Sequence, residues 1–436
     1  MFDLGDASQD YDPLLRSFVA AWSSYLERSM KPGQESLAAG LEQLGERAGK
    51  RESFAVLGKT LDGYLRSREY LQAMKQLIDS LIQAKQTGAS APWDSYAQAL
   101  EPEQLSVFER TVCTPHEVVY RHGTLQLLRF RRTQPSEFVE PVLICFALVN
   151  RPYILDLHER RSVVQQLLNR GFEVYLIDWG VPAATDCQLG LHDYICGLMK
   201  DAAAVVCEQS GSEQLNLLGY CMGGTMSTMY TSLYQAQVRN LILLAAPIDF
   251  SGDESLLNVW TQEQYFDADG LIAAYGNCPG LFLQFSFQLM KPATNFVEKY
   301  VAFAENLDNP AYLNNFLAME QWSQDNIPIA GKTFLEFVKM LYRQNRLVQG
   351  DLRLAESPIR LAAITCPVLL LVAENDHLVP ANSTRAIARH LSSAEVQTMS
   401  VDAGHIGLAV SSKSHQKLWP EATAWIADHS TQRKET

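Results

Sequence analysis

The sequence predicts an α/β fold in which a mostly parallel sheet is covered by helices. Five short, nearly continuous apolar runs recur through the chain, and helical patterns separate the earlier ones. Strands that are apolar on both faces are typical of a parallel sheet with helices on each side. At 436 residues, the chain is long enough for one large domain of this kind with an added segment.

Composition and charge exclude several classes of protein. The chain is 47% hydrophobic and 19% charged, as ordinary globular proteins are. Its formal net charge of -13, without a basic block, argues against a nucleic-acid partner. The longest apolar run, Pro141–Val149, is too short to span a bilayer, so no transmembrane helix is expected. The eight cysteines show no C-x-x-C pairing, so neither a zinc site nor a disulfide framework is expected.

Residues 1–110 are expected to form an N-terminal helical segment. Apolar residues recur at helical spacing in its early part, namely Leu15, Phe18, Val19, Trp22 and Leu26. The chain starts with acidic residues where a secretory signal would carry basic ones, which predicts a cytoplasmic protein. We expect these helices to pack on the main domain or on each other. The alternative is an interface for a second chain or a hydrophobic particle.

The main domain is expected to cover residues 111–436. It begins with period-two alternation in Glu117–Arg121 and Leu125–Phe130, which predicts a β-hairpin. The buried strands are then expected at Val142–Leu148, Val174–Ile177, Leu215–Leu218, Val238–Ala246 and Val368–Val372. Between about residues 250 and 359 the strand signals vanish and aromatic and helical patterns replace them. An insertion of this length is expected to carry its own structure as a cap or lid.

A glycine-rich turn follows the expected strand at Leu215–Leu218, with the sequence Gly219-Tyr220-Cys221-Met222-Gly223-Gly224. A tight strand-to-helix turn needs glycine on both sides, because a Cβ there would collide with the neighbouring strand and helix. The pattern is a nucleophile elbow with Cys221 in place of serine. The helix after Cys221 directs its amides and positive dipole end at the sulfur, which favours the thiolate. The Met222 amide would help to hold an oxyanion. The alternative to a nucleophile is that Cys221 is an ordinary buried cysteine in a glycine-rich turn.

An acid and a histidine follow later strand-like runs. Asp376 lies just beyond Val368–Val372, and His405 lies just beyond the next run. Cysteine, acid and then histidine is the chain order of an α/β-hydrolase triad. In this interpretation His405 is the base for Cys221, and Asp376 orients its imidazole. His377 is the competing base, but a neighbour of the acid is poorly placed to accept its hydrogen bond.

The loop after the strand at Val142–Leu148 usually supplies a second oxyanion amide in this fold, which makes Val149 or Asn150 the expected donor. Arg151, the next residue, is expected to pair with a carboxylate of the protein, with a substrate phosphate as the alternative. Two other acids near strand ends, Asp249 and Asp402, are expected to be structural.

Several separated segments resemble the poly(3-hydroxyalkanoate) synthases, particularly the short catalytic subunits of the two-component classes. These segments are Ala147–Tyr153, Val174–Gly180, Leu217–Gly224, Met290–Phe296, Asp376–Pro380 and Gly404–Gly407. The resemblance extends from about Val112 to His429. It implies an α/β-hydrolase fold, a catalytic triad of Cys221, Asp376 and His405, and a cap over the active site. The N-terminal helical segment departs from the pattern, because the short subunits largely lack one.

The resemblance also implies an activity, which is polymerisation of (R)-3-hydroxyacyl-CoA, with 3-hydroxybutyryl-CoA as the expected monomer. CoA is then the leaving group of the substrate, and no cofactor or metal is expected. The implied partners are the acyl-CoA, the growing polyester chain or granule surface, a second synthase subunit and a second copy in a homodimer. The expected location is the cytoplasm, at the surface of polyester granules.

A cysteine nucleophile suits this chemistry. Attack of a thiolate on an acyl-CoA thioester exchanges one thioester for another and so keeps the acyl group activated. Two alternatives stay open. A cysteine hydrolase of the same fold, such as an intracellular polyester depolymerase or a thioesterase, would have a similar triad in sequence. A non-catalytic granule-associated scaffold that retains the fold is the other.

Overall fold

The computed structural model describes residues 114–434, except 253–254, 292–298, 300–301, 303–305, 307–308 and 393–394. The expected helical segment, residues 1–110, lies outside the described residues and stays a prediction. The chain divides into two compact units, residues 1–77 with 288–305 and residues 78–287 with 306–436. The described strands all lie in the second unit. Along the described part of the chain, no helix combines the length and apolar character needed to cross a membrane.

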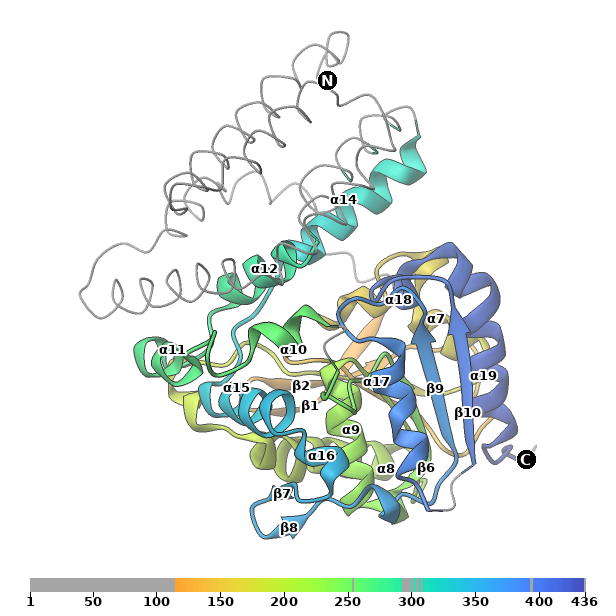
Figure 1. Ribbon diagram of the computed structural model, residues 1–436. Coiled ribbons are helices and arrows are strands. Elements are labelled where there is room, and N and C mark those ends of the chain that lie inside the picture. Colours follow the sequence, from red (N-terminus) through yellow and green to blue (C-terminus); the bar gives the residue numbers. More distant parts are fainter. Residues whose placement is uncertain are drawn as a thin grey trace. The chain divides into compact units, whose positions relative to one another are not determined.

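The described residues form a mixed sheet of eight strands in the order β1-β2-β4-β3-β5-β6-β9-β10 (Figure 1). The strands β4, β3, β5, β6, β9 and β10 run parallel, whereas β2 pairs antiparallel with β1 and with β4. Their bounds are β1 (His116–His122), β2 (Leu125–Phe130), β3 (Val142–Cys145), β4 (Val174–Asp178), β5 (Leu215–Tyr220), β6 (Val238–Leu244), β9 (Val368–Ala373) and β10 (Val396–Val401). The predicted α/β fold with a mostly parallel sheet is confirmed.

Burial explains the position of each strand in the sheet. Every residue of β3, β5 and β9 is buried, as expected for parallel strands that helices cover on both faces. Most residues of the edge strand β10 are exposed or only partly buried. A short polar edge strand of this kind discourages pairing with another chain.

Two strands end earlier than the apolar runs predicted. β3 ends at Cys145 rather than at Leu148, because the carbonyl of Phe146 turns away to accept a hydrogen bond from Trp179 Nε1 at 2.9 Å. β6 ends at Leu244 rather than two residues later, because the next residue, Ala245, has a φ of 44°. A strand cannot continue through that backbone conformation. The apolar run therefore extends past the strand in both cases.

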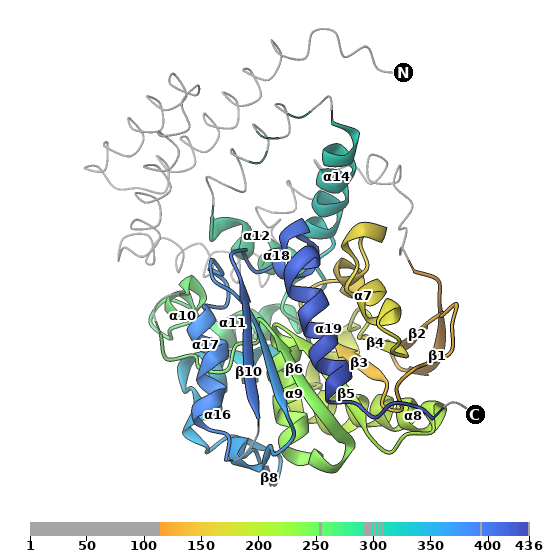
Figure 2. The same cartoon turned by 90° about the vertical axis from the view of Figure 1, so that its right-hand side faces the viewer.

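Helices cover both faces of the sheet. In Figure 1, α19 (Trp419–Asp428) lies on one side of strands β9 and β10, and α17 (Ala381–Arg385) lies on the other. α7 (Val163–Asn169) contacts α19, and the two lie near each other in Figure 2. The helix that follows β5, α9 (Met222–Leu233), packs on β3, β5 and β6. Elsewhere in the described chain, α8 (Lys200–Ser210) precedes β5 and α18 (Gly407–Val410) follows β10.

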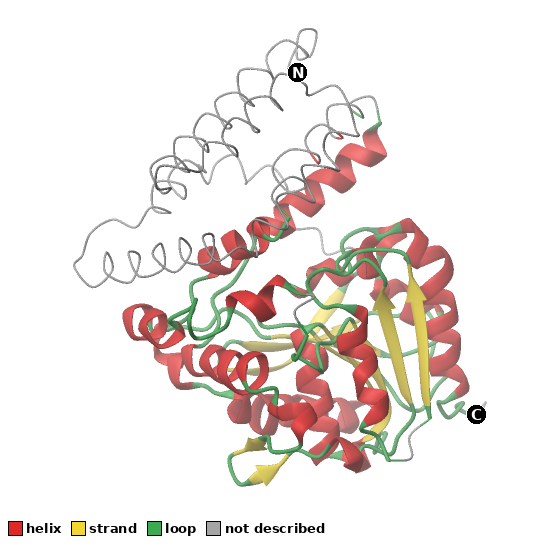
Figure 3. Cartoon of the chain, in the orientation of Figure 1, coloured by secondary structure: helices red, strands yellow, loops and turns green. Residues whose placement is uncertain are grey.

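Between β6 and β9 the described chain is mainly helical, as Figure 3 shows. The helices are α10 (Leu256–Trp260), α11 (Ala268–Tyr275), α12 (Gly280–Leu289), α14 (Pro310–Gln324), α15 (Gly331–Glu336), the π-helical η7 (Phe337–Arg343) and α16 (Arg346–Gln349). Aromatic rings join them. Phe266 stacks on Phe282 with centroids 5.8 Å apart and meets Phe334 edge-on at 6.0 Å. This interval thus has an apolar cluster of its own.

A small antiparallel hairpin ends the interval, formed by β7 (Arg353–Leu354) and β8 (Ser357–Pro358). The expectation that strand signals are absent up to residue 359 was wrong here. The two-residue turn contains Ala355 with a φ of 49°, a conformation that glycine or asparagine usually marks. The sequence therefore lacks the ordinary turn signal.

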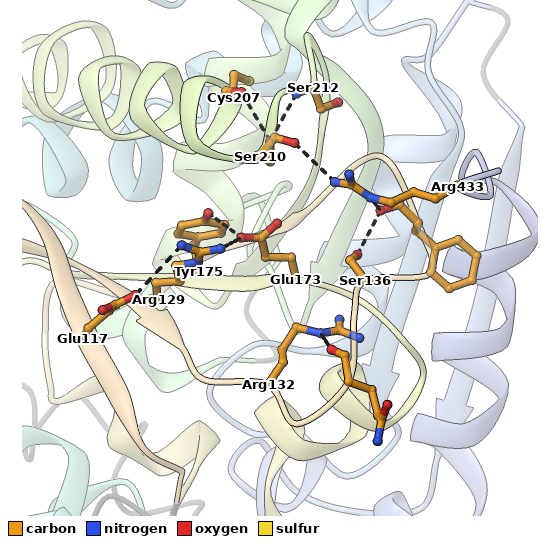
Figure 4. Close-up of polar contacts among 12 residues, drawn as sticks. Glu117, Arg129, Arg132, Ser136, Glu173, Tyr175, Cys207, Ser210, Ser212 and Arg433 are labelled. Atoms are coloured by element: carbon orange, nitrogen blue, oxygen red, sulfur yellow. Dashed lines mark hydrogen bonds and ion pairs between the residues drawn. The ribbon is translucent and has the colours of Figure 1, made fainter. Parts of the chain in front are cut away.

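Side chains also join the antiparallel strand β2 to β4 (Figure 4). Arg129 Nη2 lies 2.6 Å from Glu173 Oε1, and the hydroxyl of Tyr175 donates to the same oxygen at 2.8 Å. The Arg129 guanidinium also lies 5.9 Å from the centroid of the Tyr175 ring. Because the Glu173 side chain is only 9% exposed, its charge requires partners. Arg129 and Tyr175 supply them from neighbouring strands.

Candidate active site

Cys221 lies in the turn between β5 and α9, at the carboxyl end of the parallel strands. Its φ of 53° and ψ of -127° fall in a backbone region that residues other than glycine rarely adopt. Such a conformation costs roughly 1–3 kcal/mol and persists only where the surroundings enforce it. The Cys221 amide donates to the carbonyl of Leu244 at 2.9 Å, and its own carbonyl accepts from the Gly224 amide at 2.8 Å. The turn is therefore fixed from both sides.

The glycines around Cys221 are required by close packing. A Cβ at Gly219 would lie 2.5 Å from the Cα of Gly224. A Cβ at Gly223 would lie 2.2 Å from the carbonyl oxygen of Cys145, at the end of β3. These contacts bring α9 close to the sheet, as the nucleophile-elbow pattern requires. The predicted reason for glycine on both sides of Cys221 is confirmed.

Asp376 and His405 meet at the same edge of the sheet. Asp376 follows β9, His405 follows β10, and their Oδ2 and Nδ1 atoms lie 2.6 Å apart. The Asp376 side chain is completely buried, and its other oxygen accepts hydrogen bonds from the amides of Leu378 at 2.9 Å and Val379 at 2.8 Å. The carboxylate is therefore held on both sides, with one oxygen directed at the imidazole.

Asp376 and Cys221 both act on the pKa of His405. Burial lowers the pKa of His405, but the charges of Asp376 and Cys221, and hydrogen bonds to both, outweigh burial and raise the pKa to about 10. The structure thus brings together the three residues that the sequence singled out. An imidazole of this basicity, next to a thiol, readily takes up a proton.

The competing candidates have other surroundings. His377 is exposed, whereas the neighbouring Asp376 is buried and paired with His405. Asp402 forms an exposed ion pair with Lys413 at 2.9 Å. Asp249 accepts hydrogen bonds from the amide of Ser251 and from the side chain of Asn345. The last two acids thus have structural partners, as expected.

The loop after β3 is tied to the helical interval. Asn150 forms a β-bridge with Asn326, and Trp322 Nε1 donates to the carbonyl of Arg151 at 2.8 Å. The Nε atom of Arg151 lies 3.6 Å from Asp325 Oδ1. Arg151 therefore pairs with a carboxylate of the protein, as expected. These contacts join Asn150 and Arg151 to the last turn of α14 and the two residues after it.

The amide of Met222 is at the first position of α9, where a helix leaves its amides without an intrahelical acceptor. On the other side of the turn, Cys145 and Phe146 pack against Gly223, so the loop that continues to Val149 passes close to the elbow. Met222 thus adjoins Cys221 on the helix side, and the loop that leads to Val149 and Asn150 begins beside the elbow. Which of the two loop amides would face an oxyanion stays a prediction.

Two tyrosines near Cys221 were not singled out from the sequence. Tyr220 stacks on the imidazole of His405, with centroids 5.2 Å apart. Tyr342, in η7, is close enough for Cys221 to influence its titration: burial, and then the charge of Cys221, raise the pKa of Tyr342 well above its usual value. Tyr342 also meets the ring of Phe250 edge-on at 4.9 Å. The only available signal for Tyr220 was its place inside the turn motif.

Among the described residues, no group of three or more His, Cys, Asp or Glu side chains is arranged to hold a metal ion.

Residues 140–411 match the family model described as alpha/beta hydrolase fold. A solved thermophilic esterase from Thermogutta terrifontis is 16% identical, covering 73% of this chain and 100% of that one with a TM-score of 0.43. The sheet and the elbow, together with the family match, define an α/β-hydrolase-fold protein.

A second family model, described as Poly-beta-hydroxybutyrate polymerase (PhaC) N-terminus, matches residues 66–167. The "Poly(3-hydroxyalkanoate) polymerase subunit PhaC" of Haloferax mediterranei is 44% identical over 317 residues, which cover 73% of this chain and 64% of that protein. The subunit of the same name from Allochromatium vinosum is 39% identical over 318 residues, which cover 72% and 89%. The chain belongs to the poly(3-hydroxyalkanoate) polymerase (PhaC) family of acyltransferases.

Proposed function

We propose that this chain polymerises (R)-3-hydroxyacyl-CoA, with 3-hydroxybutyryl-CoA as the expected monomer, to poly(3-hydroxyalkanoate) with release of CoA. Cys221 is the nucleophile, His405 the base and Asp376 the group that orients it. One observation carries the proposal: in a chain of the polymerase family, the His405–Asp376 pair, at 2.6 Å, lies beside a cysteine on a strained strand-to-helix turn.

The first step is acyl transfer to Cys221. His405 takes the thiol proton, and the thiolate sulfur attacks the thioester carbonyl of the substrate. The Met222 amide and the Val149 or Asn150 amide donate to the oxyanion that forms. The bond from the carbonyl carbon to the CoA sulfur then breaks, and the CoA thiolate takes the proton from the imidazolium. The products are acyl-Cys221 and CoA, and Asp376 stabilises the imidazolium between the two transfers.

The second step forms the polyester bond. The hydroxyl of an incoming 3-hydroxyacyl unit, or of the growing chain, attacks the carbonyl carbon of acyl-Cys221. His405 takes the hydroxyl proton and returns it to the sulfur as the carbon–sulfur bond breaks. A thioester is thereby replaced by an oxoester, which is the downhill step. The same base serves both half-reactions without any further acid or cofactor.

Polymerisation requires that water does not intercept acyl-Cys221. We infer that the interval 250–359 acts as a cap that keeps the site dry. Two contacts support this role. The ring of Tyr342 reaches the neighbourhood of Cys221 from this interval, and it packs with Phe250 and Phe337. Tyr342 thus belongs to an aromatic group of this interval and lies on the side of Cys221.

The relatives suggest the partners and the location. They are named polymerase subunits, which supports a second synthase subunit as a partner of this chain. Because the proposed product is an insoluble polyester, we infer that the enzyme acts at the surface of polyester granules in the cytoplasm. A homodimer formed through the cap is the remaining expectation.

The full-length chain, incubated with (R)-3-hydroxybutyryl-CoA alone and with a second synthase subunit, tests the proposal. We expect CoA release together with insoluble polymer. Cys221→Ala should abolish both, whereas Cys187→Ala, at a partly exposed cysteine of another segment, should retain both. Stoichiometric free 3-hydroxybutyrate without polymer would identify a hydrolase instead. Failure of the substrate to label Cys221 under both conditions would indicate a non-catalytic scaffold.

A further inference from the structure

We propose that Tyr220 is a positioning residue that holds the imidazole of His405 in the plane needed to take the proton of Cys221. Tyr220 is the last residue of β5 and precedes Cys221 directly. Its ring lies 5.2 Å from the imidazole with the planes 20° apart, and its hydroxyl donates to the backbone carbonyl of His405 at 3.1 Å. The inference rests on the proposed roles of Cys221 and His405.

The two contacts of Tyr220 restrain motions that Asp376 leaves free. A single hydrogen bond from Nδ1 to Asp376 fixes one atom of the imidazole, and the ring can still rotate about that bond. The flat face of Tyr220 blocks this rotation. Its hydroxyl also holds the backbone of His405, which lies in a loop and not in a strand. Together, these contacts define the direction in which Nε2 points.

Tyr220 is itself firmly held. It is 2% exposed, and its backbone is in register with Leu244 of β6 in the centre of the sheet. On its other side, the ring meets Phe146 edge-on, with centroids 5.4 Å apart. A site built on a strand is placed more accurately than one built on a loop. Tyr220 thus transfers the rigidity of β5 to the loop that carries His405.

The phenol remains a donor at the pH values where the site would work. Burial, followed by the charges of Cys221 and Asp376, raises the pKa of Tyr220 well above 10. An ionised phenolate could not donate to the carbonyl of His405, and it would add a third negative charge beside the imidazole. The neutral hydroxyl therefore fits the geometry that it occupies.

Two substitutions of Tyr220 separate its contacts, and one distant tyrosine serves as the control. Tyr220→Phe keeps the ring and removes the hydroxyl, while Tyr220→Leu removes both contacts. Tyr230→Leu also removes a fully buried ring and a 2.6 Å hydrogen bond to Gln237. Tyr230 lies in the second half of α9, away from the elbow. The substitution matches the loss of packing without touching His405.

The readouts are the single-turnover rate of CoA release from (R)-3-hydroxybutyryl-CoA, alkylation of Cys221 by iodoacetamide across pH, and thermal unfolding. For Tyr220→Leu we expect acyl transfer to slow by about 100-fold, since misplacing a reacting group by about 1 Å has an effect of this size. The pH midpoint of alkylation should rise as well, because the imidazolium no longer faces the sulfur. Tyr220→Phe should lose about 5-fold, as expected for one hydrogen bond.

Tyr230→Leu should lower the unfolding temperature while leaving the acyl-transfer rate and the alkylation profile unchanged. If both Tyr220 variants keep the wild-type pH midpoint, or lose rate only as much as Tyr230→Leu does, Tyr220 is merely a packing residue and the inference is wrong. Should Tyr220→Leu fail to fold, the rate and midpoint of Tyr220→Phe decide the question. An active Cys221→Ala variant would instead contradict the proposed function.

Discussion

His405 Nδ1 and Asp376 Oδ2 lie 2.6 Å apart although 29 positions separate the two residues in the chain. The second oxygen of Asp376 is occupied by the amides of Leu378 and Val379. Both oxygens of this buried carboxylate therefore have assigned partners, and the imidazole receives the one that the backbone leaves over. Replacing the carboxylate by a carboxamide would change the charge of this arrangement but not its shape.

Asp376→Asn should keep the fold and lose most of the activity. The amide has nearly the same shape, but it removes the negative charge that, after burial, has the largest effect on the pKa of His405. It can also present a donor to Nδ1. The pKa of His405 should then fall, and the wrong tautomer should be favoured. Loss of the corresponding group in a serine triad costs about 10⁴-fold in turnover, and we expect about 10²–10⁴-fold in CoA release. An unchanged rate would contradict the orienting role.

The raised pKa of His405 predicts a pH-dependent contribution to stability. The ordinary pKa is 6.5 and that of the folded protein is about 10. A raised pKa means that the folded state binds the proton more tightly, so the contribution is complete below about pH 6.5 and is lost as pH rises toward about 10. The free energy of unfolding of the wild type, less that of His405→Gln, should therefore shrink over this window. Urea titrations at several pH values measure it, and a constant difference would disprove the shift.

Gly223→Ala should destabilise the protein strongly. The new Cβ would lie 2.2 Å from the carbonyl oxygen of Cys145 and 2.7 Å from backbone atoms of Phe146, which cannot yield as a flexible side chain can. We expect a loss of about 1–3 kcal/mol or more in the free energy of unfolding. Gly197→Ala is the control, since a Cβ there meets nothing within 4 Å. Equal urea midpoints for the two variants would contradict this reading of the elbow.

Arg129→Met should destabilise the sheet edge, because it leaves the nearly buried charge of Glu173 without its ion-pair partner at 2.6 Å. A buried group that loses its partner costs about 1–3 kcal/mol. Lys339→Met breaks an ion pair with Asp269 of the same length but with both side chains exposed, so it should cost less than about 1 kcal/mol. Urea unfolding of both variants tests the contrast. A larger loss for Lys339→Met than for Arg129→Met would show that burial does not decide the value of these pairs.

Local chemistry made much of the fold and site predictable. The apolar runs around Val142 and Val368 are readable as buried strands because the requirement for burial on both faces leaves no polar residue in them. The glycines beside Cys221 are readable because only glycine tolerates the close approach of helix and sheet. Asp376 and His405 follow from strand order, since parallel strands end at one edge of a sheet.

Contacts between distant segments were not predictable in the same way. The stacking of Tyr220 on His405 joins residues 185 positions apart, and no periodicity indicates which buried tyrosine faces an imidazole. Tyr342 reaches the neighbourhood of Cys221 from the helical interval, whose packing depends on tertiary contacts rather than on local propensity. The early ends of β3 and β6 depend on single backbone turns within apolar sequence.

The backbone of Cys221, with a φ of 53°, has a consequence for engineering. Glycine adopts this conformation without penalty. After allowance for the greater entropy of the unfolded chain with glycine, the free energy of unfolding of Cys221→Gly should exceed that of the wild type by about 1 kcal/mol. A selection for heat resistance alone would therefore favour replacing the residue on which turnover is proposed to depend. Libraries built on this chain should keep position 221 constant, because variants stabilised by a substitution there are expected to be inactive.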